Sequence, residues 1–267
     1  MLKDLTLGQY FPGNSPIHKL DPRVKIVSVM VYIAAVFSAS GAYSYILIAV
    51  APVAFVLLSG INVNTVLKSV KPLAFIIVFT AVINLFWTSG ETPLFSFWKI
   101  TVYAEGVATA LKMIVRLLSL VIGTFVLLTY TTSPVALTDA IESLISPLKK
   151  LGVPTHEFSM MMSIALRFIP TLIEETDKII SAQKSRGANF EEGSLIDRSK
   201  ALVPVLIPLF VSAFRRADEL ACAMECRLYH GGEGRTKLKV FKTKPSDIAA
   251  LMLFVLLLAA VIILNRI

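Results

Sequence analysis

Five stretches of the chain are almost wholly apolar, and the segments between them carry nearly all of the charge. The apolar stretches span residues 24–40, 43–59, 73–88, 106–129 and 248–264. A helix needs about 17–25 mainly apolar residues to cross the hydrocarbon of a bilayer. The pattern therefore predicts about five transmembrane helices, several of them near the lower limit of length.

The stretch between the fourth and fifth apolar segments has a different pattern. From residue 130 to 247, charged residues recur among apolar ones at helical spacing, which is typical of amphipathic helices outside the hydrocarbon. We therefore expect an all-α, polytopic membrane protein in three parts. Residues 1–129 form an N-terminal segment and the first four transmembrane helices, residues 130–246 a cytoplasmic helical domain, and residues 247–267 the fifth transmembrane helix.

Start and stop signals divide the cytoplasmic domain into helices. Ser133 followed by Pro134 is typical of a helix start, with the serine as N-cap. A second helix should begin with Thr155 as its cap and run to Arg186. Pro170 lies inside this second helix, and we expect it to kink the helix because proline removes one backbone hydrogen bond.

A third helix is predicted from near Asp197 to Arg227. Its early part, residues 202–211, is almost entirely apolar and carries Pro204 and Pro208. This apolar part is too short to span a bilayer. We expect it to lie against the membrane face.

Composition and charge support a membrane location and orient the chain. Hydrophobic residues make up 55% of the 267 positions and charged residues 16%. The net charge of +8 would suit a nucleic-acid ligand, but all but four of the 26 Lys and Arg residues fall in segments that can share the cytoplasmic side. The exceptions are Lys99, Lys112, Arg116 and Arg266. The asymmetry places the N-terminus and the helical domain in the cytoplasm and leaves no support for nucleic-acid binding.

No pattern in the sequence indicates a catalytic centre. The three histidines are scattered, and none has a metal-ligand spacing to another His, Cys or carboxylate. The glycine-rich run at residues 230–236 lacks the lysine and spacing of a phosphate-binding P-loop, and no G-x-S-x-G elbow is present. We predict no catalytic residue, no metal, no cofactor and no enzymatic activity.

Arg116 lies well inside the fourth apolar segment, with Lys112 one turn away. A guanidinium in a membrane span is costly and normally faces a protein partner or water. A functional role and a structural pairing are both open. The alternative is that the span begins near Ile114, so that both cations reach the membrane interface.

Arg186 and Arg227 share a setting, because each is predicted to end a long cytoplasmic helix. Each belongs to a short block, Ser185-Arg186-Gly187 in the first case and Glu225-Cys226-Arg227-Leu228 in the second. A single basic residue at a helix C-terminus would only complement the helix dipole, which contributes about 0.3–1 kcal/mol. The recurrence of the setting favours a shared role.

These two blocks resemble the Ala-Arg-Gly-type motifs of the transmembrane T component of energy-coupling-factor transporters, the CbiQ-like family. Ser185 replaces Ala in the first motif, and Leu228 replaces the Gly of the second. Two further blocks are similar to the family, residues 18–23 (HKLDPR) and residues 165–170 (ALRFIP). The resemblance covers essentially the whole chain.

The resemblance implies a non-catalytic scaffold in the prokaryotic cell membrane. Its cytoplasmic coupling helices would bind two ABC-type ATPase subunits through Ser185, Arg186, Gly187, Glu225 and Arg227. Its spans would lie in the lipid bilayer and hold a separate substrate-binding membrane subunit, the S component, which captures a vitamin or transition-metal ion. The solute is then chosen by another chain.

Two other classes of function remain open on the residues alone. A self-contained secondary carrier or channel would need broken helices and several polar groups at mid-membrane. Asn84 and Arg116 are the main such groups, and the sequence has no internal repeat. A membrane-anchored interaction protein that merely recruits a partner is the other alternative.

Overall fold

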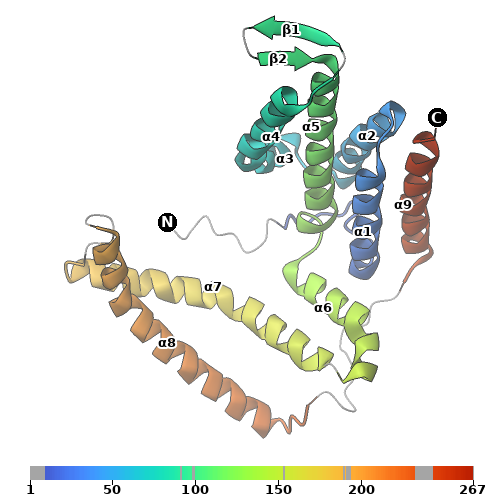
Figure 1. Cartoon of the computed structure of the whole chain (residues 1–267). Helices are drawn as coiled ribbons and strands as arrows, with labels where there is room; N and C mark the ends of the chain where they lie inside the picture. The colour runs from blue at the N-terminus through green and yellow to red at the C-terminus, as the bar shows by residue number, and fades with distance from the viewer. Residues whose placement is uncertain are drawn as a thin grey trace. The chain divides into compact units, whose positions relative to one another are not determined.

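The computed structural model describes residues 10–90, 92–97, 100–152, 154–188, 190, 194–231 and 243–266. They fall into two compact units, with a boundary between Leu137 and Thr138. One unit holds the apolar helices at both ends of the sequence, and the other holds the long amphipathic helices between them (Figure 1). Lys99 and most of the glycine-rich run of residues 230–236 lie outside the described residues.

We call the unit of residues 8–137 and 240–267 the membrane unit, because its helices match the five apolar segments. Its helices are α1 (Pro22–Ser38), α2 (Ala42–Ser59), α3 (Val63–Val70), α4 (Ala74–Trp87), α5 (Ala104–Thr124) and α9 (Pro245–Leu264). A 3₁₀ turn, Lys71–Leu73, joins α3 to α4, and a π-helical turn, Phe125–Thr129, extends α5. The third predicted segment therefore begins ten residues earlier than its apolar run, because the amphipathic α3 leads into it.

Four helical stretches of the described chain are long and apolar enough to cross a membrane. They are Ala42–Ser59, Val63–Trp87, Ala104–Thr129 and Pro245–Leu264. The 17-residue α1 is shorter, but it packs along α9 and α5 within the same unit. The chain is thus a polytopic, mainly helical membrane protein, and the predicted set of about five spans corresponds to these four stretches and α1.

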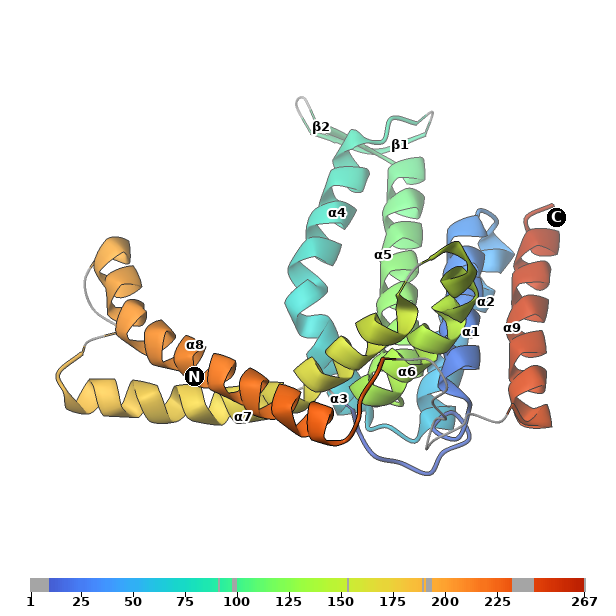
Figure 2. The same ribbon diagram turned by 90° about the horizontal axis from the view of Figure 1, so that it is seen from below.

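A short β-hairpin joins α4 to α5, where the sequence pattern predicted only a loop. Strands β1 (Pro93–Phe97) and β2 (Ile100–Tyr103) pair antiparallel and lie beyond the ends of α4 and α5 (Figures 1 and 2). Aromatic and β-branched residues, which favour strands, make up all four positions of β2 and two of the five positions of β1. The two strands are so short that the fold remains in the predicted all-α class.

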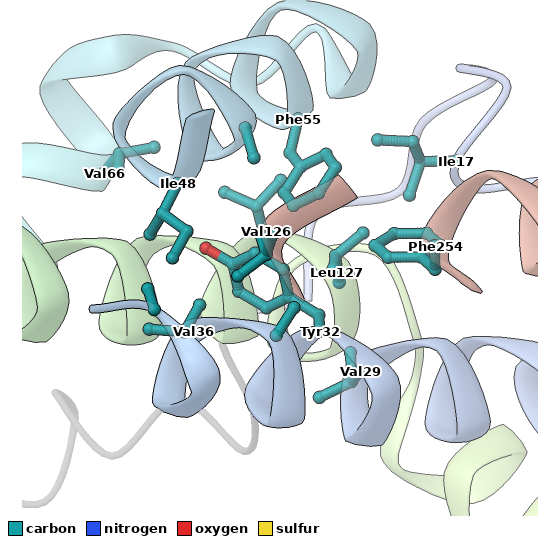
Figure 3. Packing of buried hydrophobic residues seen from close by; sticks show 14 of the residues in the cluster. Ile17, Val29, Tyr32, Val36, Ile48, Phe55, Val66, Val126, Leu127 and Phe254 are labelled. Carbon is teal, nitrogen blue, oxygen red and sulfur yellow. The ribbon is translucent and has the colours of Figure 1, made fainter. Parts of the chain in front are cut away.

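Tyr32 of α1 lies at the centre of the membrane unit and is fully buried (Figure 3). Its ring centroid is 5.3 Å from that of Phe55 on α2 and 6.5 Å from that of Phe254 on α9. Its hydroxyl donates to the Ser119 carbonyl oxygen of α5 at 2.8 Å. A Cβ at Gly123 would come within 2.4 Å of the tyrosine ring, so the glycine makes room for it.

A buried lysine in the first turn of α1 anchors this helix to the residues that follow the π-helical turn after α5. Lys25 is 2% exposed, and its Nζ donates to the Thr131 carbonyl oxygen at 2.8 Å, to Thr131 Oγ1 at 3.2 Å and to Thr132 Oγ1 at 3.1 Å. Nearby, the Asp21 backbone N–H donates to Oδ1 of the buried Asp247 at the start of α9. Three segments distant in sequence are therefore tied together where the chain leaves and re-enters the membrane unit.

The second unit contains most of α6 (Pro134–Ile145), a 3₁₀ segment (Ser146–Leu151), α7 (Thr155–Ser185) and α8 (Leu195–Cys226). Ser133 caps α6 as predicted, because its Oγ accepts from the Ala136 backbone N–H at 3.3 Å. The prediction for Thr155 was wrong: Pro154 occupies the cap position, and Thr155 is the first helical residue. Prolines are compatible with such flanking positions because the first N–H groups of a helix have no partner inside the helix.

The third predicted helix begins at Leu195, two residues before the expected Asp197. Ser194 and Asp197 form a capping box, in which each side chain bonds the other residue's backbone N–H. Pro204 and Pro208 lie inside α8. Helix α7 likewise continues through Pro170.

Helices α7 and α8 run in opposite directions and cross (Figures 1 and 2). Glu175 of α7 is central to their contact, since its carboxylate accepts from the Ser212 hydroxyl and from Arg216 Nη2, the latter at 2.9 Å. Gln183 Nε2 of α7 donates to the Pro204 carbonyl oxygen at 3.4 Å. These bonds hold the two long helices together as a hairpin.

Candidate functional site: the arginine-bearing helix ends

Arg186 is the C-cap residue of α7. The next residue, Gly187, has a left-handed backbone with φ of +88°, and its N–H donates to the Lys184 carbonyl oxygen at 3.0 Å. The Ala188 N–H donates to the Gln183 carbonyl oxygen at 3.0 Å. This pair of bonds is a Schellman ending, for which glycine is the favoured left-handed residue.

Arg227 occupies the same position at the end of α8. Leu228 takes the left-handed conformation with φ of +54°, and its N–H donates to the Glu225 carbonyl oxygen at 2.8 Å. The Tyr229 N–H donates to the Met224 carbonyl oxygen at 3.1 Å. The second motif therefore has the same backbone ending as the first, although leucine replaces the expected glycine.

The side chains of both endings are accessible. Arg186 and Arg227 are exposed, as are their neighbours Ser185 and Glu225. Within the described part of the chain, neither guanidinium has a hydrogen-bond or ion-pair partner. Leu228 is 76% exposed, so an apolar side chain stands beside the second arginine. Each ending thus presents a fork of donors to the surroundings.

The two endings lie at opposite ends of the α7–α8 hairpin. Helix α8 starts nine residues after Arg186 and has 32 residues, which corresponds to about 48 Å at 1.5 Å per residue. Glu175, eleven residues before Arg186, contacts Ser212 and Arg216 in the second half of α8. Arg186 and Arg227 are therefore tens of ångströms apart and cannot contact the same small ligand.

Arg116 is placed differently from these arginines, inside the membrane unit. Its Nη2 donates to the Ala39 carbonyl oxygen at 2.8 Å and to the Tyr45 hydroxyl at 2.5 Å. The Tyr45 ring also lies 5.8 Å from Lys112 Nζ. The guanidinium therefore pairs with the connection between α1 and α2, which gives it a structural partner at the end of those helices.

Sequence reasoning missed the network of Glu175, Ser212 and Arg216. The Ser212 hydroxyl, together with the Arg216 guanidinium, holds the pKa of Glu175 below its ordinary value of 4.5, although partial burial opposes this. The residues are 37 and 41 positions apart in the chain. No local signal joins them, and only the crossing of α7 and α8 brings them together.

The described residues contain no cluster of three or more His, Cys, Asp or Glu side chains that could hold a metal ion. Cys222 and Cys226 are exposed free thiols on α8. His156 of α7 contacts Glu142 of α6 at 3.4 Å, and Ser159 donates to the same carboxylate at 3.0 Å. That carboxylate joins α6 to α7.

The sequence matches the model of the CbiQ family, described as a cobalt transport protein, over residues 13–238. Similar proteins include the energy-coupling factor transporter transmembrane protein EcfT of Clostridium kluyveri, which is 52% identical over 100% of this chain and 98% of its own length. The EcfT protein of Bacillus subtilis strain 168 is 41% identical over 99% of this chain and 100% of its own length. That of Lactococcus lactis subsp. cremoris is 41% identical over 98% of each chain.

Proposed function

Because this chain belongs to the CbiQ family and is the transmembrane component of an energy-coupling factor transporter, we propose that it couples two ATPase subunits to a substrate-binding membrane subunit. The α7–α8 hairpin is the element that binds the ATPases. The chain itself catalyses nothing and serves as the mechanical link. The cargo, a vitamin or transition-metal ion, is captured by the separate membrane subunit.

The observation that carries this proposal is the pair of matched helix endings. Arg186 and Arg227 are C-cap residues of equivalent Schellman endings, both exposed and tens of ångströms apart. Two equal sites at that separation suit two copies of one kind of partner better than a single small ligand. Each ATPase subunit would receive one ending.

The chemistry of the guanidinium suits such a contact. Arginine stays charged at any physiological pH and presents five donors in a fixed planar fork, which pairs well with carboxylates or helix C-termini. A basic residue that only complemented its own helix dipole would contribute about 0.3–1 kcal/mol. A desolvated charge pair with a partner protein contributes more to specificity and to the lifetime of the complex.

The bonds between α7 and α8 couple the movements of the two helices. Glu175 joins α7 to α8 through Ser212 and Arg216, so displacement of one helix end moves the other helix as well. A hairpin that moves as one body can convert the closing of two ATPases into one displacement. This requires that both endings engage their partners at the same time.

Charge reversal at the two endings tests the proposal. Arg186→Glu and Arg227→Glu should each weaken ATPase association, and the double variant should abolish solute uptake while the protein still inserts and folds. Disrupting one member of a buried charge pair costs about 2–5 kcal/mol, which corresponds to a loss of affinity of roughly 30-fold or more. The measurements are co-purification of the ATPase subunits and uptake by intact cells.

Arg198→Glu is the matched control. Arg198 is exposed like the two motif arginines, but it lies in the first turn of α8 and not at the C-terminal end of a helix. A negative charge there complements the dipole of α8, so the variant should fold and transport normally. Wild-type uptake and ATPase co-purification in the double variant would refute the coupling role of the two arginines.

A further inference from the structure

An apolar groove lies in the membrane unit between α2, α3 and α5. It encloses about 310 Å³, and its walls include Val53 and Leu57 of α2, Val63 and Leu67 of α3, and Leu118 and Ile122 of α5. Its lining has one polar residue, Ser119, which is 2% exposed and donates its hydroxyl to the Ile48 carbonyl oxygen. The groove therefore offers hydrocarbon contact and no hydrogen-bonding group.

The dimensions of the groove match a hydrocarbon chain. Its wall on α2 runs from Ala49 to Leu57, about 12 Å at 1.5 Å per residue. One leaflet of the bilayer contributes about 15 Å of hydrocarbon, half of the total thickness. The α2 wall therefore covers most of the length of one leaflet's hydrocarbon.

Lys68 and Lys71 lie just after Leu67, the last residue of α3 that lines the groove. Val63 and Leu67 line the groove, and Lys71 follows at the same four-residue spacing, which places the three residues along one face of the helix. Lys68 adjoins Leu67 on the next position. Both lysines are exposed. The apolar wall thus leads directly to a pair of positive charges.

No carboxylate within the groove-forming helices neutralises these lysines. Glu105 is the single acidic residue of α2, α3 and α5, all of which the structure describes in full. It lies in the first turn of α5, more than two turns before Val115, the first groove-lining residue of that helix. Within these three helices the two lysines have no counter-charge near the end of the groove, so an anion from outside the helices can pair with them.

We propose that this groove binds one anionic phospholipid of the bilayer, with an acyl chain between α2, α3 and α5 and the phosphate against Lys68 and Lys71. Such a lipid combines an apolar chain of one-leaflet length, which suits the groove, with a negative headgroup at its end, which suits the lysines. Basic residues at a membrane face are attracted to anionic lipids. The charge asymmetry of the loops places both lysines on the cytoplasmic side.

The test uses the full chain reconstituted in vesicles of equal phosphatidylglycerol and phosphatidylethanolamine. After extraction into a mild detergent, native mass spectrometry counts the phospholipids that stay bound. The wild-type chain should retain phosphatidylglycerol over phosphatidylethanolamine by fivefold or more. The Lys68→Gln/Lys71→Gln variant should lose this preference, whereas Lys68→Arg/Lys71→Arg should keep it.

Two further variants separate the groove from general charge effects. Val53→Phe, at a position that is 58% exposed, fills the groove and should lower retention of both lipids. Lys19→Gln removes another exposed lysine of the same unit that lies away from the groove, and it should leave the preference unchanged. Equal retention of the two lipids by the wild-type chain overturns the proposal. So does an unchanged preference in the glutamine double variant, or crosslinking of a photoreactive residue at position 53 to a polypeptide and not to lipid.

Discussion

At the scale of single residues, the left-handed backbone of Leu228 is the clearest departure from local preference. Leu228 has φ of +54°, and Gly187 has φ of +88° at the matching position of α7. A left-handed conformation costs an L-residue about 1–2 kcal/mol, whereas glycine adopts it freely. The exposed leucine side chain gains nothing from burial within the chain to offset this cost. Strain of this kind is characteristic of binding positions.

Leu228→Gly should therefore stabilise the protein. The substitution relieves the strain, but glycine gains more conformational entropy than leucine in the unfolded chain. The free energy of unfolding should therefore rise by about 0.5–1 kcal/mol. Thermal unfolding in detergent should show a higher midpoint than the wild type. The reciprocal Gly187→Leu should lower it, and a lower midpoint for Leu228→Gly would mean that the leucine side chain itself stabilises the fold.

Lys25 is the second residue whose environment predicts a measurable effect. Lys25→Met keeps the length of the side chain but leaves the buried oxygens of Thr131 and Thr132 without their shared donor. Such unsatisfied buried groups cost about 1–3 kcal/mol. We expect a lower unfolding midpoint for Lys25→Met and no change for Lys19→Met, because Lys19 is exposed. Equal midpoints for the two variants would contradict the role of Lys25 as an anchor.

At the scale of elements, the contact between α7 and α8 contains one carboxylate, Glu175, whose ionisation is sensitive to the fold. The pKa of Glu175 is depressed in the folded protein, first by the Ser212 hydroxyl and then by Arg216. A depressed pKa means that the folded state favours the ionised form. The stabilisation is therefore fully present above the unfolded pKa and is lost as the pH falls through the folded pKa.

This dependence can be measured as a difference between two proteins. At pH 7 the wild type should be more stable than Glu175→Gln, because only the carboxylate pairs with Arg216 as an ion. The difference should shrink as the pH falls below about 4.5, the ordinary value for the group, and vanish below the depressed pKa. Thermal unfolding across a pH series would reveal this trend, and a constant difference would exclude Glu175 as its source.

At the scale of the whole molecule, the distribution of Lys and Arg predicts orientation. A cysteine placed near Lys99 should react with an impermeant reagent from outside the cell. One placed near Asn189 should react only after the membrane is permeabilised. Both positions lie outside the described residues, so the prediction rests on charge alone. The reverse labelling pattern would overturn the cytoplasmic placement of the helical unit.

The purified chain should neither bind nor hydrolyse ATP. It lacks a P-loop lysine in sequence, and the glycine-rich run at residues 230–236 follows the end of α8 without a strand before it in the described chain. A phosphate-release assay with the chain alone should match the rate without protein. Saturable hydrolysis by this chain would contradict its role as a non-catalytic link between ATPases and the substrate-binding subunit.

Much of the fold could be predicted because its signals are local. Apolar length identified α1, α2, α4, α5 and α9 of the membrane unit, and Ser133 and Gly187 marked helix boundaries through hydrogen bonds within a few residues. The positions of Arg186 and Arg227 at helix ends followed from the same stop signals. Their role in binding ATPases stays a prediction. The β-hairpin was missed because its strands are short and lie between two stronger apolar segments.

The sequence by itself determined that this chain is a helical membrane protein with arginines at two helix ends, because hydropathy, periodicity and caps act over a few residues. The tertiary structure decided which distant polar groups meet. It paired Arg116 with the α1–α2 connection, Lys25 with Thr131, and Glu175 with Arg216. Each helix presents several polar groups, and its rotation and register against its neighbours select the partner. That selection depends on packing across the whole unit, which no local pattern encodes.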